Sequence, residues 1–316
     1  MNNSMDPLHE PPSVETITAL LDVIAPGAAP LVVDSLPGSY SNSTHFVDVR
    51  YPNDYVFRIV VRRYAVFGDY DRGEKARREF KTCKLLKAHG IPAPQALYLD
   101  DEGKLLGVPG IVTRYVPGEL VMPPANPPAD PLIWARALAT MLTRIHSIFC
   151  DSAAQSFLLD ANAEATWFAR SKAAPDYMKA HPDGALVWKT VRGRLPDLKP
   201  VSPALVHVDY WPGNVLWNEG RITAVLDWEE AAYGDPGIDV AYCRMDMVLN
   251  GLDQAADEFL AVYEAEMGPV ANLGFWELAA AARPMFDPVG WIEESPEKER
   301  FRQFIADAKK RLDAEE

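Results

Sequence analysis

Residues 206–239 read VHVDYWPGNVLWNEGRITAVLDWEEAAYGDPGID, and the interpretation of the whole chain starts from this stretch. Asp209 and Asn214 stand in the pattern HxDxxxxN directly before an apolar run, and Asp227 directly follows a second apolar run. A turn, Asn218 to Arg221, separates the two runs, which predicts a loop followed by a small β-hairpin. Pro212 and Gly213 allow the loop to bend between Asp209 and Asn214.

These residue types suit phosphoryl transfer. One carboxylate accepts a hydrogen bond from the attacking hydroxyl, and further oxygen ligands hold magnesium against the phosphates of the nucleotide. Magnesium keeps several waters, so one Asn and one Asp are sufficient protein ligands. The spacing therefore predicts Asp209 as the base, and Asn214 and Asp227 as the magnesium ligands.

The same segment resembles the aminoglycoside phosphotransferase and choline kinase family of the kinase-like superfamily. The patterns HxDxxPGN, LDWE and GDPxxD carry the resemblance, which is strong in 206–239 and weaker over about 14–312. It implies the same roles for Asp209, Asn214 and Asp227. It also implies that His207 and Asp239 support the catalytic loop structurally.

The rest of the chain agrees with an α+β, protein-kinase-like fold of two lobes. Five strand-like runs and one helix, 72–89, precede Pro117-Gly118, whereas helical spacing dominates from about residue 130. We expect a small, mainly antiparallel β lobe that binds the nucleotide, and a larger helical lobe with the catalytic loop, metal site and acceptor pocket. The expected boundaries are 1–13 for a disordered N-terminus, 14–118 for the first lobe and 119–316 for the second.

The predicted nucleotide site lies in the first lobe. The loop 37–43 resembles the family's nucleotide-positioning loop, although a small polar loop between strands is commonly only a turn. Alternation along a strand sends one of Arg62 and Arg63 into the site, and the family pattern selects Arg62, with Glu79 as its partner; ordinary surface residues are the alternative. Residues 111–118 resemble the hinge that pairs with the base, but they do not distinguish ATP from GTP. The predicted nucleotide-binding residues are Ser39, Tyr40, Ser41, Asn42, Arg62, Glu79, Thr113 and Tyr115.

Composition and charge limit the partners. The net charge is −14, with 13 Lys/Arg and 14 Asp/Glu in residues 1–118 against 18 and 31 in the remainder. Such an acidic surface argues against nucleic acid. No run approaches the roughly 20 apolar residues of a membrane helix, and the polar start lacks a signal peptide, so we expect a cytoplasmic protein that binds no membrane. Three dispersed cysteines, Cys83, Cys150 and Cys243, predict reduced thiols.

The acceptor is a small molecule whose identity the sequence does not encode. Acidity in the second part favours a cation, such as an aminoglycoside or an amino alcohol, although solubility explains the same charge. Trp211, Glu229 and Glu230 flank the catalytic residues and are candidate acceptor contacts, as is Trp228. Two other interpretations remain: a catalytically silent nucleotide-binding module, and a protein kinase, for which the Ala-Pro-Glu motif is missing. The oligomeric state is not predicted.

Overall fold

The computed structural model describes residues 8–36, 42–65, 71–123, 125–289, 291–292 and 295–314. By its internal contacts the chain divides into two compact units. The first comprises Met1–Pro117 and Thr223–Glu229, and the second comprises Gly118–Ile222 and Glu230–Glu316. The segment Thr223–Glu229, which carries Asp227, therefore groups with the first unit, whereas the boundaries drawn from the sequence put it in the second.

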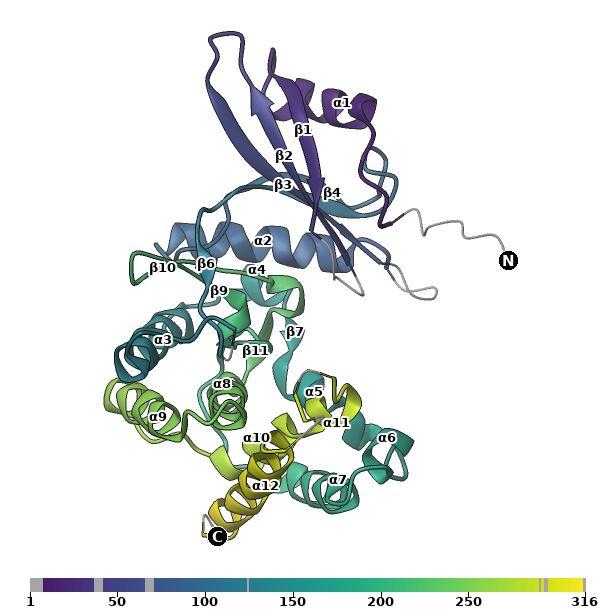
Figure 1. Ribbon diagram of the computed structural model, residues 1–316. Coiled ribbons are helices and arrows are strands. Elements are labelled where there is room, and N and C mark those ends of the chain that lie inside the picture. The colour runs from purple at the N-terminus through teal and green to yellow at the C-terminus, as the bar shows by residue number, and fades with distance from the viewer. Residues whose placement is uncertain are drawn as a thin grey trace. The chain divides into compact units, whose positions relative to one another are not determined.

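The first unit is built on a five-stranded antiparallel sheet in the order β1-β2-β3-β5-β4 (Figure 1). Each of its strands lies close to a run predicted from β-branched and alternating residues. The strands are β1 (Ala29–Ser35), β2 (Asn42–Arg50), β3 (Val56–Tyr64), β4 (Ala96–Asp100) and β5 (Gly110–Arg114).

Two helices use different faces of this sheet. α1 (Val14–Ile24) buries Ile17, Leu20 and Leu21 with a strand set that includes Val61. α2 (Glu74–Ala88) instead packs near Tyr64 and Ile111. Because successive side chains of a strand point to opposite faces, Arg62 of β3 lies on the same face as Tyr64, toward α2.

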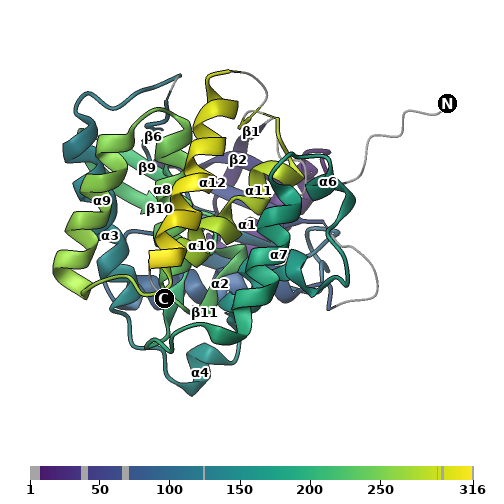
Figure 2. The same cartoon turned by 90° about the horizontal axis from the view of Figure 1, so that it is seen from below.

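The second unit is mainly helical. α9 packs against α3 and α8, and α10 packs against α8 and α12 (Figure 2). The helices are α3 (Pro131–His146), α4 (Ser152–Gln155), α5 (Ala161–Ala165), α6 (Asp176–Lys179), α7 (Gly184–Arg194), α8 (Gly237–Leu249), α9 (Asp253–Met267), α10 (Leu273–Ala280), α11 (Ala282–Phe286) and α12 (Glu297–Ala314). Short 3-10 turns are η1 (Trp167–Arg170), η2 (Leu195–Asp197), η3 (Pro212–Asn214) and η4 (Trp228–Glu230), whose first two residues belong to the first unit.

Short strands accompany the helices. β6 pairs with β9, and β11 pairs with both β7 and β8. β9 and β10 form where the hairpin is predicted, and Glu219 and Gly220 between them both have positive φ, as tight hairpin turns require. The strands are β6 (Glu119–Leu120), β7 (Leu159–Asp160), β8 (Ala204–Val206), β9 (Val215–Asn218), β10 (Arg221–Val225) and β11 (Ala232–Gly234).

The sequence 273–286 has helical spacing throughout, yet the structure divides it into α10 and α11. Pro284 explains the break, because its ring clashes with the carbonyl of the residue four positions earlier, Ala280, and it donates no backbone hydrogen bond. The break turns α11 into a separate short element, and this element carries Arg283. Among the described helices none is both long and apolar enough to cross a membrane.

Candidate active site

The loop that carries Asp209 is held from below by a buried carboxylate. Asp239, in the first turn of α8, is fully buried and accepts hydrogen bonds from the backbone nitrogens of His207 (2.7 Å) and Val208 (2.8 Å). Val208 has φ 73°, which is costly for a β-branched residue. The two hydrogen bonds to Asp239 hold this strained backbone immediately before Asp209.

Asp239 is itself fixed by a further buried group. His146 of α3 lies with Nε2 3.1 Å from Oδ2 of Asp239 and with Nδ1 2.8 Å from the hydroxyl of Tyr263. The ring of His207 is also buried, and its Nδ1 accepts a hydrogen bond from the backbone nitrogen of Asp209 at 3.3 Å. Both histidines thus brace the loop from within the second unit.

The carboxylate of Asp209 is paired with an amide and with a guanidinium. The Asn214 amide nitrogen donates to Asp209 Oδ2 at 2.8 Å and to the Asp209 carbonyl at 2.9 Å. Arg283 Nη1 donates to Asp209 Oδ1 at 2.6 Å. The Asp209 side chain nevertheless keeps 25% of its surface exposed, so it remains accessible to a reactant.

Other polar and aromatic groups gather around this carboxylate. The Arg283 guanidinium lies 4.5 Å from the centre of the Tyr242 ring and donates to Glu230 at 3.5 Å. Asp246 of α8 is buried. Its burial, as the larger cause, and the negative charge of Asp209, as the smaller one, raise the pKa of Asp246 to about 7. Near neutral pH, Asp246 therefore changes its protonation state beside the candidate base.

Trp211 belongs to a stack of aromatic rings. Its ring centroid lies 5.7 Å from that of Trp291, which in turn lies 6.0 Å from that of Tyr242. A Cβ added at Gly213 would come within 2.5 Å of the Trp211 ring, so only glycine fits there without a shift. The stack contacts Arg283 through Tyr242, which places Trp211 in the surroundings of Asp209.

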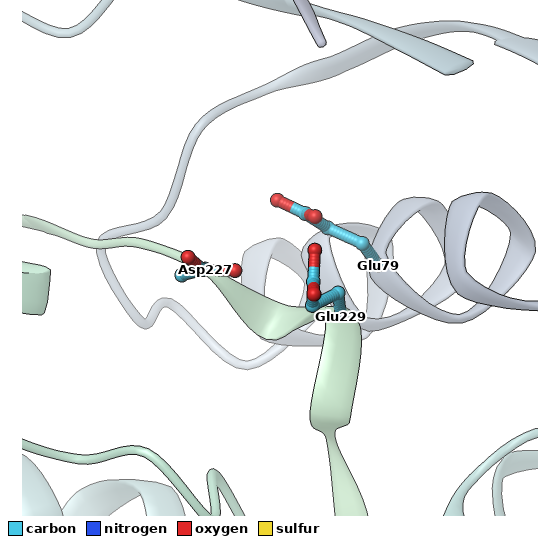
Figure 3. Close-up of side chains that lie close together, drawn as sticks. All are labelled: Glu79, Asp227 and Glu229. Carbon is cyan, nitrogen blue, oxygen red and sulfur yellow. The ribbon is translucent and has the colours of Figure 1, made fainter. Parts of the chain in front are cut away.

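A second cluster lies in the first unit around Arg62. Its Nη2 lies 2.6 Å from Asp227 Oδ1 and 2.9 Å from Glu229 Oε2, and its Nη1 lies 3.4 Å from Glu79 Oε1. Ligand oxygens of the three carboxylates all lie within 4.8 Å of one another. Figure 3 shows Glu79 projecting from α2 toward Asp227 and Glu229. Three carboxylates thus converge on one guanidinium.

This convergence shifts protonation. Burial raises the pKa of Glu79 to about 7, while Arg62 opposes the shift and Asp227 adds to it. The Tyr64 hydroxyl donates a short hydrogen bond to Glu79, and burial raises the pKa of Tyr64 well above its ordinary value. Arg62 thus offsets the negative charge of the three carboxylates. Because their charges interact, removing one carboxylate will change the pKa values of the other two.

Glu229 lies elsewhere than predicted. Its carboxylate contacts Arg62, Lys75 (2.9 Å) and the Asn42 amide (2.5 Å), and its backbone carbonyl accepts from Arg78 (2.6 Å). All these partners are first-unit residues around the predicted phosphate-binding Arg62. The contacts thus contradict the expected acceptor role of Glu229, because cations of the first unit neutralise its charge. The ring of Trp228 is fully buried as well, so it lines no acceptor pocket in this structure.

The other residues predicted to bind the nucleotide lie in the segment before β2, at the start of β2, and in and after β5. Ser39, Tyr40 and Ser41 lie outside the described residues, while Asn42 begins β2. Thr113 is an internal residue of β5, paired with its neighbours β3 and β4. The Tyr115 backbone nitrogen already donates to the Arg58 carbonyl at 3.1 Å, so it is not the donor that would pair with a base.

Sequence reasoning missed three charged residues near the predicted ones. Arg283 and Asp246 adjoin Asp209, and Lys75 adjoins Glu229. None lies in a recognisable motif. Only for Asp246 was a signal present, since it lies between two methionines in the largely apolar sequence of α8, where a carboxylate is expected to be buried.

The chain resembles known proteins both in sequence and in fold. The model of the phosphotransferase enzyme family matches residues 33–273. A curated relative, mouse acyl-CoA dehydrogenase family member 10, is 30% identical over 228 residues, covering 63% of this chain but 21% of that protein. The chain spans between a fifth and a quarter of the length of the first curated relatives that it matches.

Two solved structures share the fold at low sequence identity. The GDP and kanamycin complex of APH(2")-IIia has a TM-score of 0.60 at 18% identity, covering 95% of this chain and 97% of that one. The ADP-bound aminoglycoside phosphotransferase APH(2'')-Ib has a TM-score of 0.59 at 17% identity, covering 93% and 97%. These similarities confirm the predicted α+β, kinase-like fold.

The chain belongs to the phosphotransferase enzyme family, since the family model covers most of its length. This membership agrees with the phosphotransferase class that the catalytic-loop pattern predicts. The predicted family and enzyme class are thereby confirmed.

Proposed function

We propose that the protein transfers the γ-phosphoryl group of ATP or GTP to a hydroxyl of a small acceptor, with Asp209 as the base. The observation that carries the proposal is the state of Asp209: fixed by Asn214 and Arg283, yet one quarter exposed. The acceptor hydroxyl donates its hydrogen bond to Asp209. The bond from its oxygen to the γ-phosphorus forms, the bond from that phosphorus to the β-phosphate oxygen breaks, and Asp209 takes the proton.

Arg62 is the proposed cation for the α- and β-phosphates, and Glu79 positions it. Nε of Arg62 is buried and has no hydrogen-bond partner among the described residues, so the guanidinium retains a donor. Asn42 adjoins the same cluster through Glu229 and is the described end of the proposed phosphate-covering loop. Thr113 and Tyr115 would only shape the segment beside the purine base of the nucleotide.

Asn214 and Asp227 are the proposed magnesium ligands, and their chemistry fits a hard cation. The Asn214 amide nitrogen is committed to Asp209, which leaves the oxygen end of the amide for a metal. Asp227 has φ 62° and a side chain that is 35% exposed, and only its Oδ1 bonds to Arg62. Bound magnesium would neutralise charge on the β- and γ-phosphates.

For the acceptor we propose a molecule whose cationic groups lie away from the reacting hydroxyl. The acidity of residues 119–316 supports a cation such as an aminoglycoside or an amino alcohol, and Glu230, 44% exposed, offers a carboxylate. Arg283, however, lies against Asp209, so an ammonium directly beside the reacting hydroxyl would meet a like charge. Trp211 and Glu230 remain the proposed acceptor contacts.

A second acceptor class has its own support. The curated relative with 30% identity is named as an acyl-CoA dehydrogenase family member, and this chain corresponds to a fifth of it. A phosphotransferase segment joined to such a protein would share its metabolites, which suggests a hydroxyacyl thioester. Arg283 beside the base suits a carbonyl or carboxylate oxygen near the reacting hydroxyl.

The test is nucleotide-dependent phosphorylation of a panel: kanamycin, choline, a hydroxy acid and a hydroxyacyl-CoA. Release of nucleoside diphosphate and the mass of the acceptor are followed with magnesium and with excess chelator. The proposal predicts turnover with at least one acceptor class that the chelator abolishes. A cationic acceptor should also lose affinity as the salt concentration rises from about 50 to about 500 mM. The Debye screening length, about 10 Å at 0.1 M, shortens as salt is added, which weakens attraction to the acidic surface. Tight nucleotide binding without transfer to any acceptor would instead support the catalytically silent module.

A further inference from the structure

The catalytic loop itself supplies no positive charge to the transferred group. From Asp209 to Asn214 it reads DYWPGN, without a lysine or arginine. During transfer, negative charge is spread over the three equatorial oxygens of the phosphoryl group, and a fixed cation close to them lowers the barrier. Magnesium held by Asn214 and Asp227 would neutralise charge on the β- and γ-phosphates, and a protein cation next to Asp209 would add to this on the side of the acceptor hydroxyl.

Arg283 of α11 stands at that position. Nη1 donates to Asp209 Oδ1 at 2.6 Å, and Nη2 donates to the backbone carbonyl of Val208 at 2.9 Å. Each contact is to the residue proposed as the base or to its strained neighbour. The guanidinium is therefore attached to the same carboxylate that receives the acceptor proton.

The surroundings hold this guanidinium charged and in place. Tyr242 lies beneath it at 4.5 Å, and Glu230 accepts from Nη2 at 3.5 Å. Although burial alone lowers the pKa of Arg283, the hydroxyl of Tyr242 and the carboxylates of Asp209 and Glu230 raise it overall. A guanidinium has five N–H donors, so these contacts do not exhaust it.

We propose that Arg283 is a catalytic residue that supplies, from α11, the cation contacting the phosphoryl group while it passes to the hydroxyl held by Asp209. This inference rests on the proposed function. A hydroxyl oxygen hydrogen-bonded to Asp209 lies roughly 2.7 Å from the carboxylate. This oxygen attacks the γ-phosphorus while the bond from that phosphorus to the β-phosphate oxygen breaks, so the equatorial oxygens of the transferred group come near the donors held on the same carboxylate.

A merely structural role for Arg283 makes a different prediction. If the side chain only braces the loop, its loss changes nucleotide ground-state binding and transition-state binding alike. If it stabilises the transferred charge, its loss is confined to the transition state, where removal of one such donor costs about 100- to 1,000-fold in kcat. The two roles are separated by an analogue of the planar, transferring phosphoryl group.

The experiment measures binding of Mg·ADP alone and of Mg·ADP with aluminium fluoride, by calorimetry, to the full chain. The wild type should bind the fluoride complex far more tightly than ADP. Arg283→Met should lose at least about tenfold of that enhancement, with ADP alone bound within about threefold of wild type. Arg283→Lys, which keeps a charge without the fork, should retain part of it.

The matched control is Arg311→Met, which removes a guanidinium of the second unit that donates to Glu277 at 3.1 Å and not to Asp209, and which should keep the full enhancement. The inference is overturned if Arg283→Met and Arg283→Lys keep the wild-type enhancement, or if the wild type binds ADP but gains nothing from fluoride. A wild type that binds no nucleotide at all contradicts the proposed function itself. Thermal melting of each variant establishes that it is folded.

Discussion

The buried carboxylate of Asp239 offers a substitution whose effect follows from its contacts. Asp239→Asn replaces an acceptor-only group by an amide of the same shape. The wild-type carboxylate accepts from the backbone nitrogens of His207 and Val208 on different oxygens, and His146 Nε2 lies 3.1 Å from one of them. The amide has one oxygen, so its NH2 group must face a backbone N–H.

The magnitude follows from these hydrogen bonds. A hydrogen bond to a charged group contributes about 1.5–3 kcal/mol, and an unsatisfied buried donor costs about 1–3 kcal/mol. One such bond is lost outright and the others weaken, which gives roughly 3–5 kcal/mol. For a unit of this size, melting should fall by about 2–4 °C for each kcal/mol. Val208 at φ 73° would also lose its restraint, so kcat should fall more than nucleotide affinity.

Urea unfolding and steady-state kinetics of Asp239→Asn test this reasoning. Glu277→Gln is the control, because Glu277 is also buried, at 2% exposed, and pairs with Arg244 and Arg311. It should lose comparable stability yet keep kcat in the folded protein. A stability loss below about 1 kcal/mol for Asp239→Asn, or equal kcat losses in both variants, would refute the account of the loop.

Two further substitutions test the acidic and basic groups of the sites. Asp246 has an ordinary pKa of 3.8 and a folded pKa of about 7, so its contribution to stability is present below pH 4 and is lost as pH rises through 7. Asp246→Asn should therefore be more stable than wild type at pH 8 but not at pH 4. The gain at pH 8 should be a few kcal/mol, at about 1.4 kcal/mol for each pKa unit, and urea unfolding that gives the same difference in stability at both pH values would contradict this. Arg62→Met should weaken nucleotide binding roughly 10- to 100-fold by calorimetry, because charged hydrogen bonds to phosphate are lost, and unchanged affinity would remove Arg62 from the site.

Much of the fold is readable from the sequence because its elements are half buried. Strands β2 and β3 alternate, and α9 and α12 carry one apolar face, so their periods identify them. The helix α8 was not predicted. Twelve of its thirteen residues are buried, and a helix that is buried on every side lacks the amphipathic period that sequence reasoning uses.

The candidate site divides in the same way. Asp209, Asn214 and Asp227 belong to one local pattern, so spacing alone identifies them as candidates. Arg283 lies 74 residues beyond Asp209, and it stands in the separate short helix α11. Glu229 shows the opposite error: adjacency to Asp227 suggested the acceptor, whereas its partners are Arg62, Lys75 and Asn42. Long-range pairing is decided by tertiary contacts that a motif does not encode.

The most direct test of the central claim is the rate of phosphoryl transfer by Asp209→Asn in single-turnover kinetics, with the acceptor that the panel identifies. The amide keeps the shape of the side chain, although its hydrogen bond with Arg283 is weaker. Unlike the carboxylate, the amide cannot take the proton of the acceptor hydroxyl. The account predicts a fall of about 100- to 10,000-fold in the transfer rate, with nucleotide affinity unchanged within about threefold. Transfer at more than about a tenth of the wild-type rate would contradict the role of Asp209 as the base.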